Sequence, residues 1–417
     1  MILPSVGRAR TRFLADFVRN YRTVSRRTTV ADVSVLVREL LIMNAPIFDP
    51  LIPPPLATGD LPGIGGQIKT RPEDFEVEEI PAYPPSGSGE HLFLWVEKRG
   101  LGAEYFVRQV ARRLDISPSA VGTAGLKDRH AVTRQMVSVP ARAEPRLAQL
   151  DGDGIRLLNV SRHGNKLKPG HLHGNRFRIL LRDVVADAAE RLPPLIERLR
   201  REGLANFYGS QRFGRDGETV LLGMSLLRQQ APPVGIRTNP RSPFLRKLAL
   251  SAAQSALFNH CLARRMADGL MRRVLPGDVM ARWPFGGMFV AEDVTAEQAR
   301  LDAREIVPAG PIFGRKIFRA AAEAAGREDE VLHDAGLTPA AFTTFGKLLS
   351  GTRRHNLVYV DDLSAAIEPE GVRMTFALPA GSYATVVLQA LVGEPPPGSP
   401  HSPSPNPVLT FCVPAGY

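Results

Sequence analysis

Cysteine is scarce in this chain of 417 residues, which contains only two, Cys261 and Cys412. They lie far apart and neither belongs to a Cys-x-x-Cys pair, so the sequence predicts neither a disulfide framework nor a zinc site built from cysteines. So few thiols without a pairing pattern are typical of a reducing compartment, and we expect a cytoplasmic protein.

Long uncharged apolar runs are also missing. None reaches the length that a membrane-spanning helix needs, and the N-terminal arginines are not followed by the apolar core of a signal peptide. The stretch "GIGG" (63–66) lacks a third glycine at Ile68, so the dinucleotide-binding fingerprint fails. His171 and His173 have no carboxylate or third histidine at ligand spacing. We therefore expect no membrane association, cofactor or metal.

Acidic residues are in the minority, with 42 against 53 basic ones, a net charge of +11 and a sequence pI of about 10.0. Such an excess favours a polyanionic partner, and nucleic acid is the first candidate. Residues 1–42 hold eight arginines, no lysine and three acidic residues. Part of the positive charge therefore lies in an appendage, but the remaining chain is still basic.

The two ends of the chain differ in composition from the middle. We expect residues 1–55 to be an N-terminal extension that is disordered, or not translated upstream of Met43. Within it, residues 13–21 have apolar side chains at helical spacing with arginines between them, a pattern that suits RNA or a membrane surface. Residues 393–417 contain eight prolines in 25 residues and are expected to form a disordered tail.

The middle of the chain mixes the two kinds of periodicity. Apolar patterns predict strands at 75–80, 91–98, 132–139, 155–160, 175–181, 357–360 and 372–378. Helices are expected at 103–114, near 185–201, from Ser242 to Gly269, and after a Ser382 cap. This mixture predicts an α+β fold, and the length favours two domains.

Two of the predicted strands have informative patterns. The strand at 91–98 is apolar on both faces, so it is expected inside a sheet. In the acidic run at 73–79 the charges alternate with Phe75 and Val77, which predicts a solvated edge.

A single carboxylate, Asp128, stands in the basic stretch "GTAGLKDRHAVTRQ" (122–135). Its basic neighbours are Lys127, Arg129, His130 and Arg134. Nearby cations hold a carboxylate ionised, as a nucleophile or general base requires. The alternative is a turn aspartate in a solvated ion pair. The stretch feeds the strand predicted at 132–139, where a rigid scaffold can present a functional side chain.

The stretch "HGNRF" (173–177) has the alternation of a strand. Its continuation puts Asn175, Phe177 and Ile179 on one face and the arginines at 176 and 178 on the other. One face is suited to a base and the other to phosphates, while the alternative is an ordinary amphipathic strand with Phe177 in the core.

Two further stretches suit RNA. Residues 161–174 form a basic loop broken by Gly and Pro, with Lys166 and Lys168 available for phosphates or simply for solvent. The stretch "NFYGSQRFG" (206–214) interleaves aromatic rings with Arg212, as base-stacking surfaces do. Its alternative is a glycine-rich turn with buried rings.

Taken together, the motifs resemble the TruD family of tRNA pseudouridine synthases over residues 56–392. The stretches that carry the resemblance are "KTRPEDFEVEE" (69–79) leading into "GSGEH" (87–91), "GLKDRHAVTRQ" (125–135), "RHGNKLKPGHLHGNRF" (162–177), "NFYGSQRFG" (206–214) and "LPAGSYATVVLQAL" (378–391). The resemblance implies a V-shaped α+β protein. A pseudouridine synthase catalytic domain, with a mixed and mainly antiparallel sheet and helices, would comprise 56–202 and 356–392. An inserted, family-specific α/β domain would occupy 203–355.

The resemblance also implies roles for single residues. Asp128 matches the catalytic aspartate and Lys69 the basic residue that pairs with it. Phe177 matches the aromatic residue under the target base, and Phe75 and Asn175 match further substrate contacts. The basic residues that we expect to contact RNA are Lys127, Arg129, Lys166, Lys168 and Arg212.

The implied activity is isomerisation of a specific uridine to pseudouridine, and the resemblance points to uridine 13 of the tRNA D arm. We expect a monomer that needs no cofactor or metal. A uridine in folded RNA must leave its stack to react, which calls for an aromatic pocket and a basic surface. One alternative is a non-catalytic RNA-binding or RNA-folding protein. Another is a metal-dependent RNA nuclease, which needs clustered carboxylates.

Overall fold

The computed structural model describes residues 48–51, 53–125, 127–231 and 242–393. The chain divides into two units after Asp49, and every element named below belongs to the second. The predictions of a helix at 13–21, of a start at Met43 and of a disordered tail fall outside the described residues, apart from Gly393. Within the described residues, no helix combines the length and the apolar composition needed to cross a bilayer.

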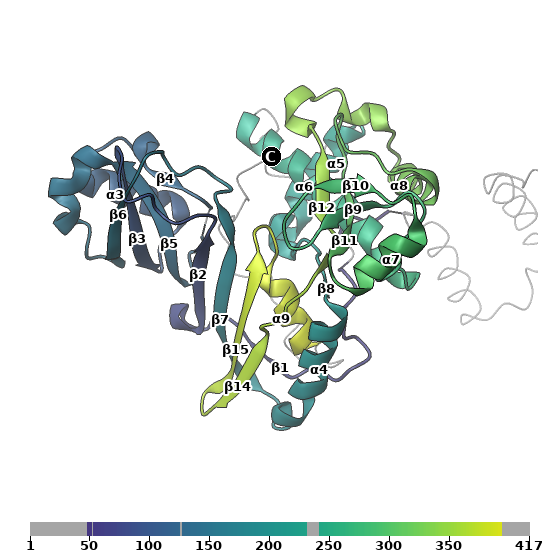
Figure 1. Cartoon of the computed structure of the whole chain (residues 1–417), viewed down its shortest axis with the longest axis horizontal. Helices are drawn as coiled ribbons and strands as arrows, with labels where there is room; N and C mark the ends of the chain where they lie inside the picture. Colours follow the sequence, from purple (N-terminus) through teal and green to yellow (C-terminus); the bar gives the residue numbers. More distant parts are fainter. Residues whose placement is uncertain (1–47, 52, 126, 232–241, 394–417) are drawn as a thin grey trace, which may run out of the picture. The chain divides into compact units, whose positions relative to one another are not determined.

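The larger sheet has nine strands among the described residues (Figure 1). They are β1 (Gly65–Gln67), β2 (Phe75–Pro81), β3 (His91–Arg99), β4 (Gly122–Thr123), β5 (Val132–Pro140), β6 (Ile155–His163), β7 (Leu172–Val184), β14 (Ser364–Glu368) and β15 (Gly371–Pro379). The order across the sheet is β14-β15-β7-β2-β5-β3-β6, with β1 added to β7 and β4 added to β5. This mixed sheet confirms the predicted α+β class.

One pair of strands in this sheet runs parallel. All the other pairings are antiparallel, but β2 and β5 lie side by side in the same direction, with Glu76 opposite Val132. Parallel strands begin at the same edge of a sheet. The segments that enter β2 and β5 are therefore brought together, and these segments carry Lys69 and Asp128.

The interior position predicted for residues 91–98 is confirmed, because β3 lies between β5 and β6. The solvated edge predicted for residues 73–79 is wrong. Strand β2 lies inside the sheet between β7 and β5, and both Asp74 and Glu79 are buried. Their charges are matched by Arg182 and Lys127, which come from distant parts of the sequence.

Three helices pack on this sheet, namely α3 (Ala103–Leu114), α4 (Ala188–Glu202) and α9 (Ala384–Val392). Helix α3 buries Phe106, Val110 and Leu114 in an apolar cluster with residues of β3 and β5. Helices α4 and α9 contribute to a second cluster with residues of β2, β7 and β15. The predicted bounds of the helix at 103–114 are confirmed.

Residues 279–355 contribute a second sheet, of four strands. Its order is β10 (Met288–Val290), β9 (Val279–Arg282), β11 (Ile306–Ile312) and β12 (Thr352–His355). The associated helices are α5 (Glu218–Leu227), α6 (Pro243–Ala267), α7 (Val294–Asp302) and α8 (Ala322–Asp334). Every pairing in this sheet is antiparallel. The described part of this region therefore differs from the expected α/β type, because its neighbouring strands pair only in the antiparallel direction.

Two helix caps test the local predictions. Helix α6 begins as predicted, with Ser242 accepting a hydrogen bond from the Leu245 N–H at 3.4 Å and Pro243 in the first position. The chain turns at Gly269, which has a φ of +70° that favours glycine. The Ser382 cap is wrong, since α9 has Tyr383 at its N-cap while Ser382 closes a turn onto the Pro379 carbonyl.

Two predicted boundaries also shift. The loop expected at 161–174 is shorter, because β6 continues to His163 and β7 begins at Leu172. The strand expected at 357–360 is reduced to β13 (Leu357–Val358), which pairs with β8 (Leu204–Ala205). In the first case pairing in the large sheet extends the strands beyond what their own sequence favours.

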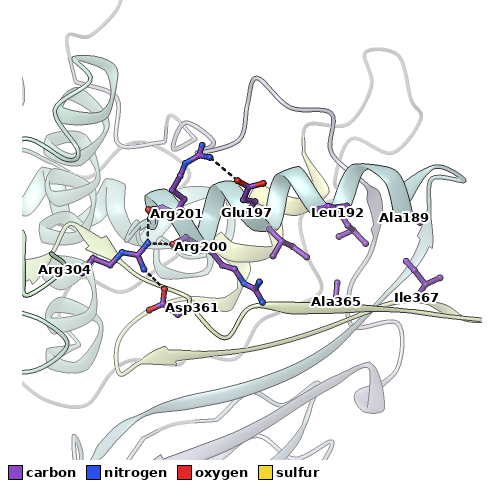
Figure 2. Close-up of a pocket in the computed structure, with 11 residues that line it drawn as sticks. Ala189, Leu192, Glu197, Arg200, Arg201, Arg304, Asp361, Ala365 and Ile367 are labelled. Carbon is purple, nitrogen blue, oxygen red and sulfur yellow. Dashed lines mark hydrogen bonds and ion pairs between the residues drawn. The ribbon is translucent and has the colours of Figure 1, made fainter. Parts of the chain in front are cut away.

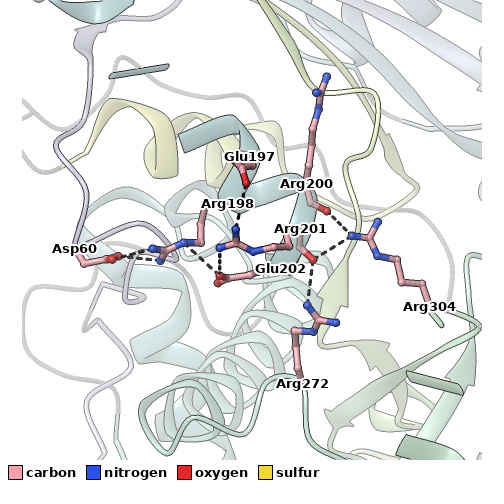
Figure 3. Close-up of polar contacts among 8 residues, drawn as sticks. All are labelled: Asp60, Glu197, Arg198, Arg200, Arg201, Glu202, Arg272 and Arg304. Carbon is pink, nitrogen blue, oxygen red and sulfur yellow. Dashed lines mark hydrogen bonds and ion pairs between the residues drawn. The ribbon is translucent and has the colours of Figure 1, made fainter. Parts of the chain in front are cut away.

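The C-terminal end of α4 joins the two sheets through arginine side chains (Figure 3). Arg304 donates to the backbone carbonyls of Arg200 and Arg201 at 2.7 and 3.1 Å, and Arg272 donates to the Arg201 carbonyl at 3.2 Å. The last carbonyls of a helix lack partners within it and carry partial negative charge. Cations from the second sheet region therefore cap a helix of the first.

His355 on β12 generates a prediction about stability and pH. Burial, with the neighbouring Arg354 charge, lowers the pKa of His355 from 6.5 to about 4. At a pH between these two pKa values, His355 is protonated in the unfolded chain and neutral in the folded chain. The free energy of unfolding therefore decreases as the pH falls from 6.5 toward 4. We expect urea unfolding midpoints to fall less between pH 7 and pH 5 for His355→Gln than for the unmodified protein. Equal losses in the two proteins would contradict this assignment.

Candidate active site

Asp128 lies between β4 and β5, where the chain enters the parallel pair. Its carboxylate is 17% exposed, and its Oδ2 forms an ion pair with Lys69 Nζ. Its Oδ1 accepts a hydrogen bond from the His130 N–H at 3.2 Å. Both oxygens therefore face donors, and the Lys69–Asp128 pairing that the resemblance implied is present.

Lys69 has an unusual backbone for a residue with a side chain. Its φ is +58°, in the left-handed region. Its Nζ lies 4.4 Å from the centroid of the Phe75 ring, in the geometry of a cation–π contact. Strained backbone of this kind persists where the surroundings hold it and is frequent at functional sites.

Asp74 anchors the turn that leads from Lys69 into β2. It accepts two hydrogen bonds from Arg182 on β7, at 2.9 and 2.7 Å, and one from the Arg71 N–H at 2.9 Å. The Arg182 guanidinium holds the pKa of this carboxyl below its ordinary value. The position of Lys69 therefore depends on an ion pair between the 3-10 turn Pro72–Asp74, which precedes β2, and strand β7.

The aromatic residues form a row across three strands. The ring centroids of Phe75 and Phe177 are 6.2 Å apart in an edge-to-face arrangement, and Phe177 stacks on Phe376 at 5.3 Å. Phe75 and Phe177 are 4% and 7% exposed and belong to the apolar core. The alternation predicted for β7 is confirmed, since Phe177 and Ile179 are buried while Arg176 and Arg178 are exposed. Contact of Phe177 with a base stays a prediction.

Lys98 on β3 binds the backbone of the Asp128 loop, and the sequence did not predict this role. This lysine is fully buried, and its Nζ donates to the backbone carbonyls of Leu101 at 2.6 Å and Asp128 at 2.8 Å. By strand register its side chain shares a face with Thr133 of β5 and Val77 of β2. A lysine near the end of an apolar interior strand was the only signal in the sequence.

The basic residues predicted to contact RNA fall into two groups. Arg129 and Lys168 are exposed, and Lys166 is partly exposed with its Nζ directed to the Ser119 carbonyl. Lys127 and Arg212 are 7% and 8% exposed. Their contact with RNA stays a prediction.

The partners of Arg212 lie inside the protein. It donates to Ser251 and Ser255 and lies 5.6 Å from the Tyr208 ring centroid. Phe207 and Tyr208 are buried too, so residues 206–214 match the alternative of a turn with buried rings rather than an exposed stacking surface.

Arg354 is a second residue that sequence reasoning missed. It donates to the Asn206 carbonyl at 3.0 Å, to Asn206 Oδ1 at 2.7 Å and to the Gly381 carbonyl at 2.8 Å. Its guanidinium lies 4.2 Å from the Tyr208 ring centroid. The motifs at 206–214 and 378–391 are therefore tied together by one arginine from β12.

A separate surface hollow of about 720 Å³ lies between α4 and β14 (Figure 2). Leu192, Ile196 and Ile367 give it apolar walls, and Arg304 stands at one end with its ion pair to Asp361. None of its lining residues is among the predicted site residues. Among the described residues, no three His, Cys, Asp or Glu side chains are placed to hold a metal ion.

Lys98 generates a prediction about the Asp128 loop. Lys98→Met keeps the length of the side chain but removes the charged donors to the two carbonyls, at a cost of about 2 kcal/mol in the free energy of unfolding. We expect faster hydrogen exchange in residues 127–131, with exchange in α3 unchanged. A variant with unchanged exchange in 127–131 would show that Lys98 does not hold this loop.

Comparison with known proteins places these features in a family. The family model for tRNA pseudouridine synthase D (TruD) matches residues 56–232 and 240–391. The tRNA pseudouridine synthase D of Anaeromyxobacter dehalogenans is 44% identical over 339 residues, covering 81% of this chain and 95% of the relative. That of Thermus thermophilus is 40% identical over 339 residues, covering 81% and 92%.

A solved structure has the same fold. The putative tRNA pseudouridine synthase D of Methanosarcina mazei superposes with a TM-score of 0.67 at 24% identity, covering 81% of this chain and 95% of that one. The sequence relatives and the family model extend over most of the chain, and the family model covers every stretch that carries the resemblance. The chain therefore belongs to the TruD family of tRNA pseudouridine synthases, which are isomerases.

Proposed function

We propose that this protein converts uridine 13 in the D arm of tRNA to pseudouridine, with Asp128 as the essential carboxylate. The observation that carries the proposal is the ion pair of Asp128 with Lys69, beside the Phe75 ring at the edge where β2 and β5 begin. A paired carboxylate that is only 17% exposed combines negative charge with partial exclusion of water.

The reaction needs little besides such a carboxylate. The N1–C1′ bond of uridine breaks, the detached uracil turns, C5 bonds to C1′ and the C5 proton is lost, while a proton is bound at N1. Nothing is oxidised, and no group enters from outside. Lys69 balances the charge of Asp128, and the Phe75 and Phe177 rings limit the water that could intercept the reacting sugar.

The substrate base has to leave its stack to reach Asp128. We assign the face of β7 that carries Asn175 and Phe177 to the flipped uracil, with Phe75 beside it. Arg129, Lys166 and Lys168 are assigned to the phosphate backbone, where basic side chains position RNA without reading its sequence. Lys127 and Arg212 are buried, so in this proposal they support the RNA-binding surface through their partners inside the protein, Glu79 and Ser255, rather than by direct contact with phosphates.

The domain organisation follows the same proposal. Residues 56–202 and 356–392 would form the catalytic domain and 203–355 the inserted domain, in a V-shaped monomer that holds tRNA between its arms in the cytoplasm. This division is supported by the return of the chain to the first sheet, where β15 pairs along β7 from Gly174 to Leu181.

Asp128→Asn tests the proposal directly. The substitution preserves shape and removes charge, so we expect pseudouridine formation in unmodified tRNA transcripts to fall at least about 10³-fold while RNA binding is retained. The product should map to position 13 with the unmodified protein. If neither protein converts a uridine although both bind tRNA, the chain is an RNA-binding protein without this activity.

Lys69 gives a second test. In Lys69→Met the carboxylate loses its cation, and we expect kcat to fall about a hundredfold, with a smaller loss in Lys69→Arg because that variant keeps the charge. Single-turnover rates at saturating tRNA separate this effect from binding. Equal rates for the Met and Arg variants would show that the charge of Lys69 does not assist the reaction.

A further inference from the structure

Glu79, Lys127 and Asn175 form a polar group, and Lys127 is the residue directly before Asp128 in the chain. Glu79 and Asn175 are directly opposite each other on β2 and β7, so they share a face of the sheet. Lys127 Nζ lies 3.0 Å from Glu79 Oε2 and also donates to Asn175 Oδ1. The Glu79 and Lys127 side chains are only 1% and 6% exposed.

A buried ion pair of this kind contributes little net free energy to the stability of a fold. Desolvation of two charges offsets much of their attraction, and apolar residues of similar size often serve as well. Glu79 is held at its other oxygen by the Met136 N–H at 3.4 Å. It therefore fixes the ammonium group of Lys127 in front of the Asn175 amide.

Lysine has hydrogen-bond donors and no acceptor, so only the oxygen of the amide can face it. The amide nitrogen of Asn175, with its two N–H donors, is thereby turned the other way. Among the described residues it has no acceptor within the protein. Without Lys127 the amide could present either its oxygen or its nitrogen.

We propose that Lys127, held by Glu79, locks the Asn175 amide so that it offers only N–H donors to the target base. Lys127 and Glu79 are positioning residues in this scheme, which rests on the proposed function because that function places Asn175 against the base. Uracil carries a carbonyl oxygen at C4 where cytosine carries an amino group. The locked amide can therefore donate a hydrogen bond to a carbonyl oxygen of uracil, whereas the amino group of cytosine would oppose it donor to donor.

The lock is tested first at Asn175. Transcripts with uridine, 2-thiouridine or 4-thiouridine at the target position differ in the acceptor strength of one base atom. We expect one of the two thio substitutions to lower kcat/KM about fivefold with the unmodified protein and to have no effect with Asn175→Ala. Asn175→Asp keeps an oxygen for Lys127 and replaces the donor, so its activity should fall below that of Asn175→Ala.

The positioning residues are tested together, because Lys127→Met alone would leave Glu79 as an unpaired buried charge. We expect the combined Glu79→Gln and Lys127→Met protein to lose the thio effect, and the same two changes to lower kcat/KM by a smaller factor in an Asn175→Ala background than with Asn175 present. Lys347→Met, a change of an exposed lysine on the 3-10 turn Gly346–Leu349, is the control for charge.

Three results would overturn the inference. The first is a full thio effect in the combined variant while it still converts uridine, and the second is the absence of any thio effect in the unmodified protein. The third is an Asn175→Asp variant as active as the unmodified protein. A protein that converts no uridine in any transcript would instead refute the proposed function on which the inference rests.

Discussion

The parallel pairing of β2 and β5 is the constraint on which the site depends. In a sheet whose other pairings are antiparallel, it brings two segments that are 59 residues apart, carrying Lys69 and Asp128, to the same edge. Neither segment holds its position alone. Lys69 has a left-handed backbone that is anchored through Asp74 and Arg182, and the backbone of the Asp128 loop is bound by Lys98.

The face of the sheet beneath this site is divided by polarity. One apolar cluster packs α3 on β3 and β5, and the other packs α4 and α9 on β2, β7 and β15. Between the clusters, by strand register, lie buried polar side chains, among them Glu79, Lys98 and Gln135. Buried polar groups are costly unless they are paired. Here the loop that carries Lys127 and Asp128 supplies partners for Glu79 and Lys98, and in the proposed function the target base binds at the same place.

Arginine side chains connect the two sheet regions by binding backbone carbonyls of distant segments. Arg304 and Arg272 cap the C-terminal carbonyls of α4, and Arg354 joins Asn206 to Gly381. A guanidinium can bind several carbonyls at once in a fixed geometry, which a lysine cannot do as rigidly. The high arginine content of this chain thus has an internal use as well as the one that net charge alone suggests.

Local pattern determined a large part of this protein. Periodicity and capping residues predicted α3, the start of α6, the interior position of β3 and the alternating faces of β7, because these depend on neighbours within one turn or one strand. The resemblance of five short motifs identified the family and, with it, the pairing of Lys69 with Asp128. Composition alone favoured a basic protein with a polyanionic partner, nucleic acid first among the candidates.

Only the tertiary structure decided the partners of the charged residues. The acidic run at 73–79 has the pattern of a solvated edge, yet strands from distant parts of the sequence enclose it and supply Arg182 and Lys127 as counter-charges. Lys98, Arg212 and Arg354 likewise have ordinary surface-residue identities and internal partners. Whether a charge faces water or a partner depends on strand order and register, which long-range pairing sets and local sequence does not encode.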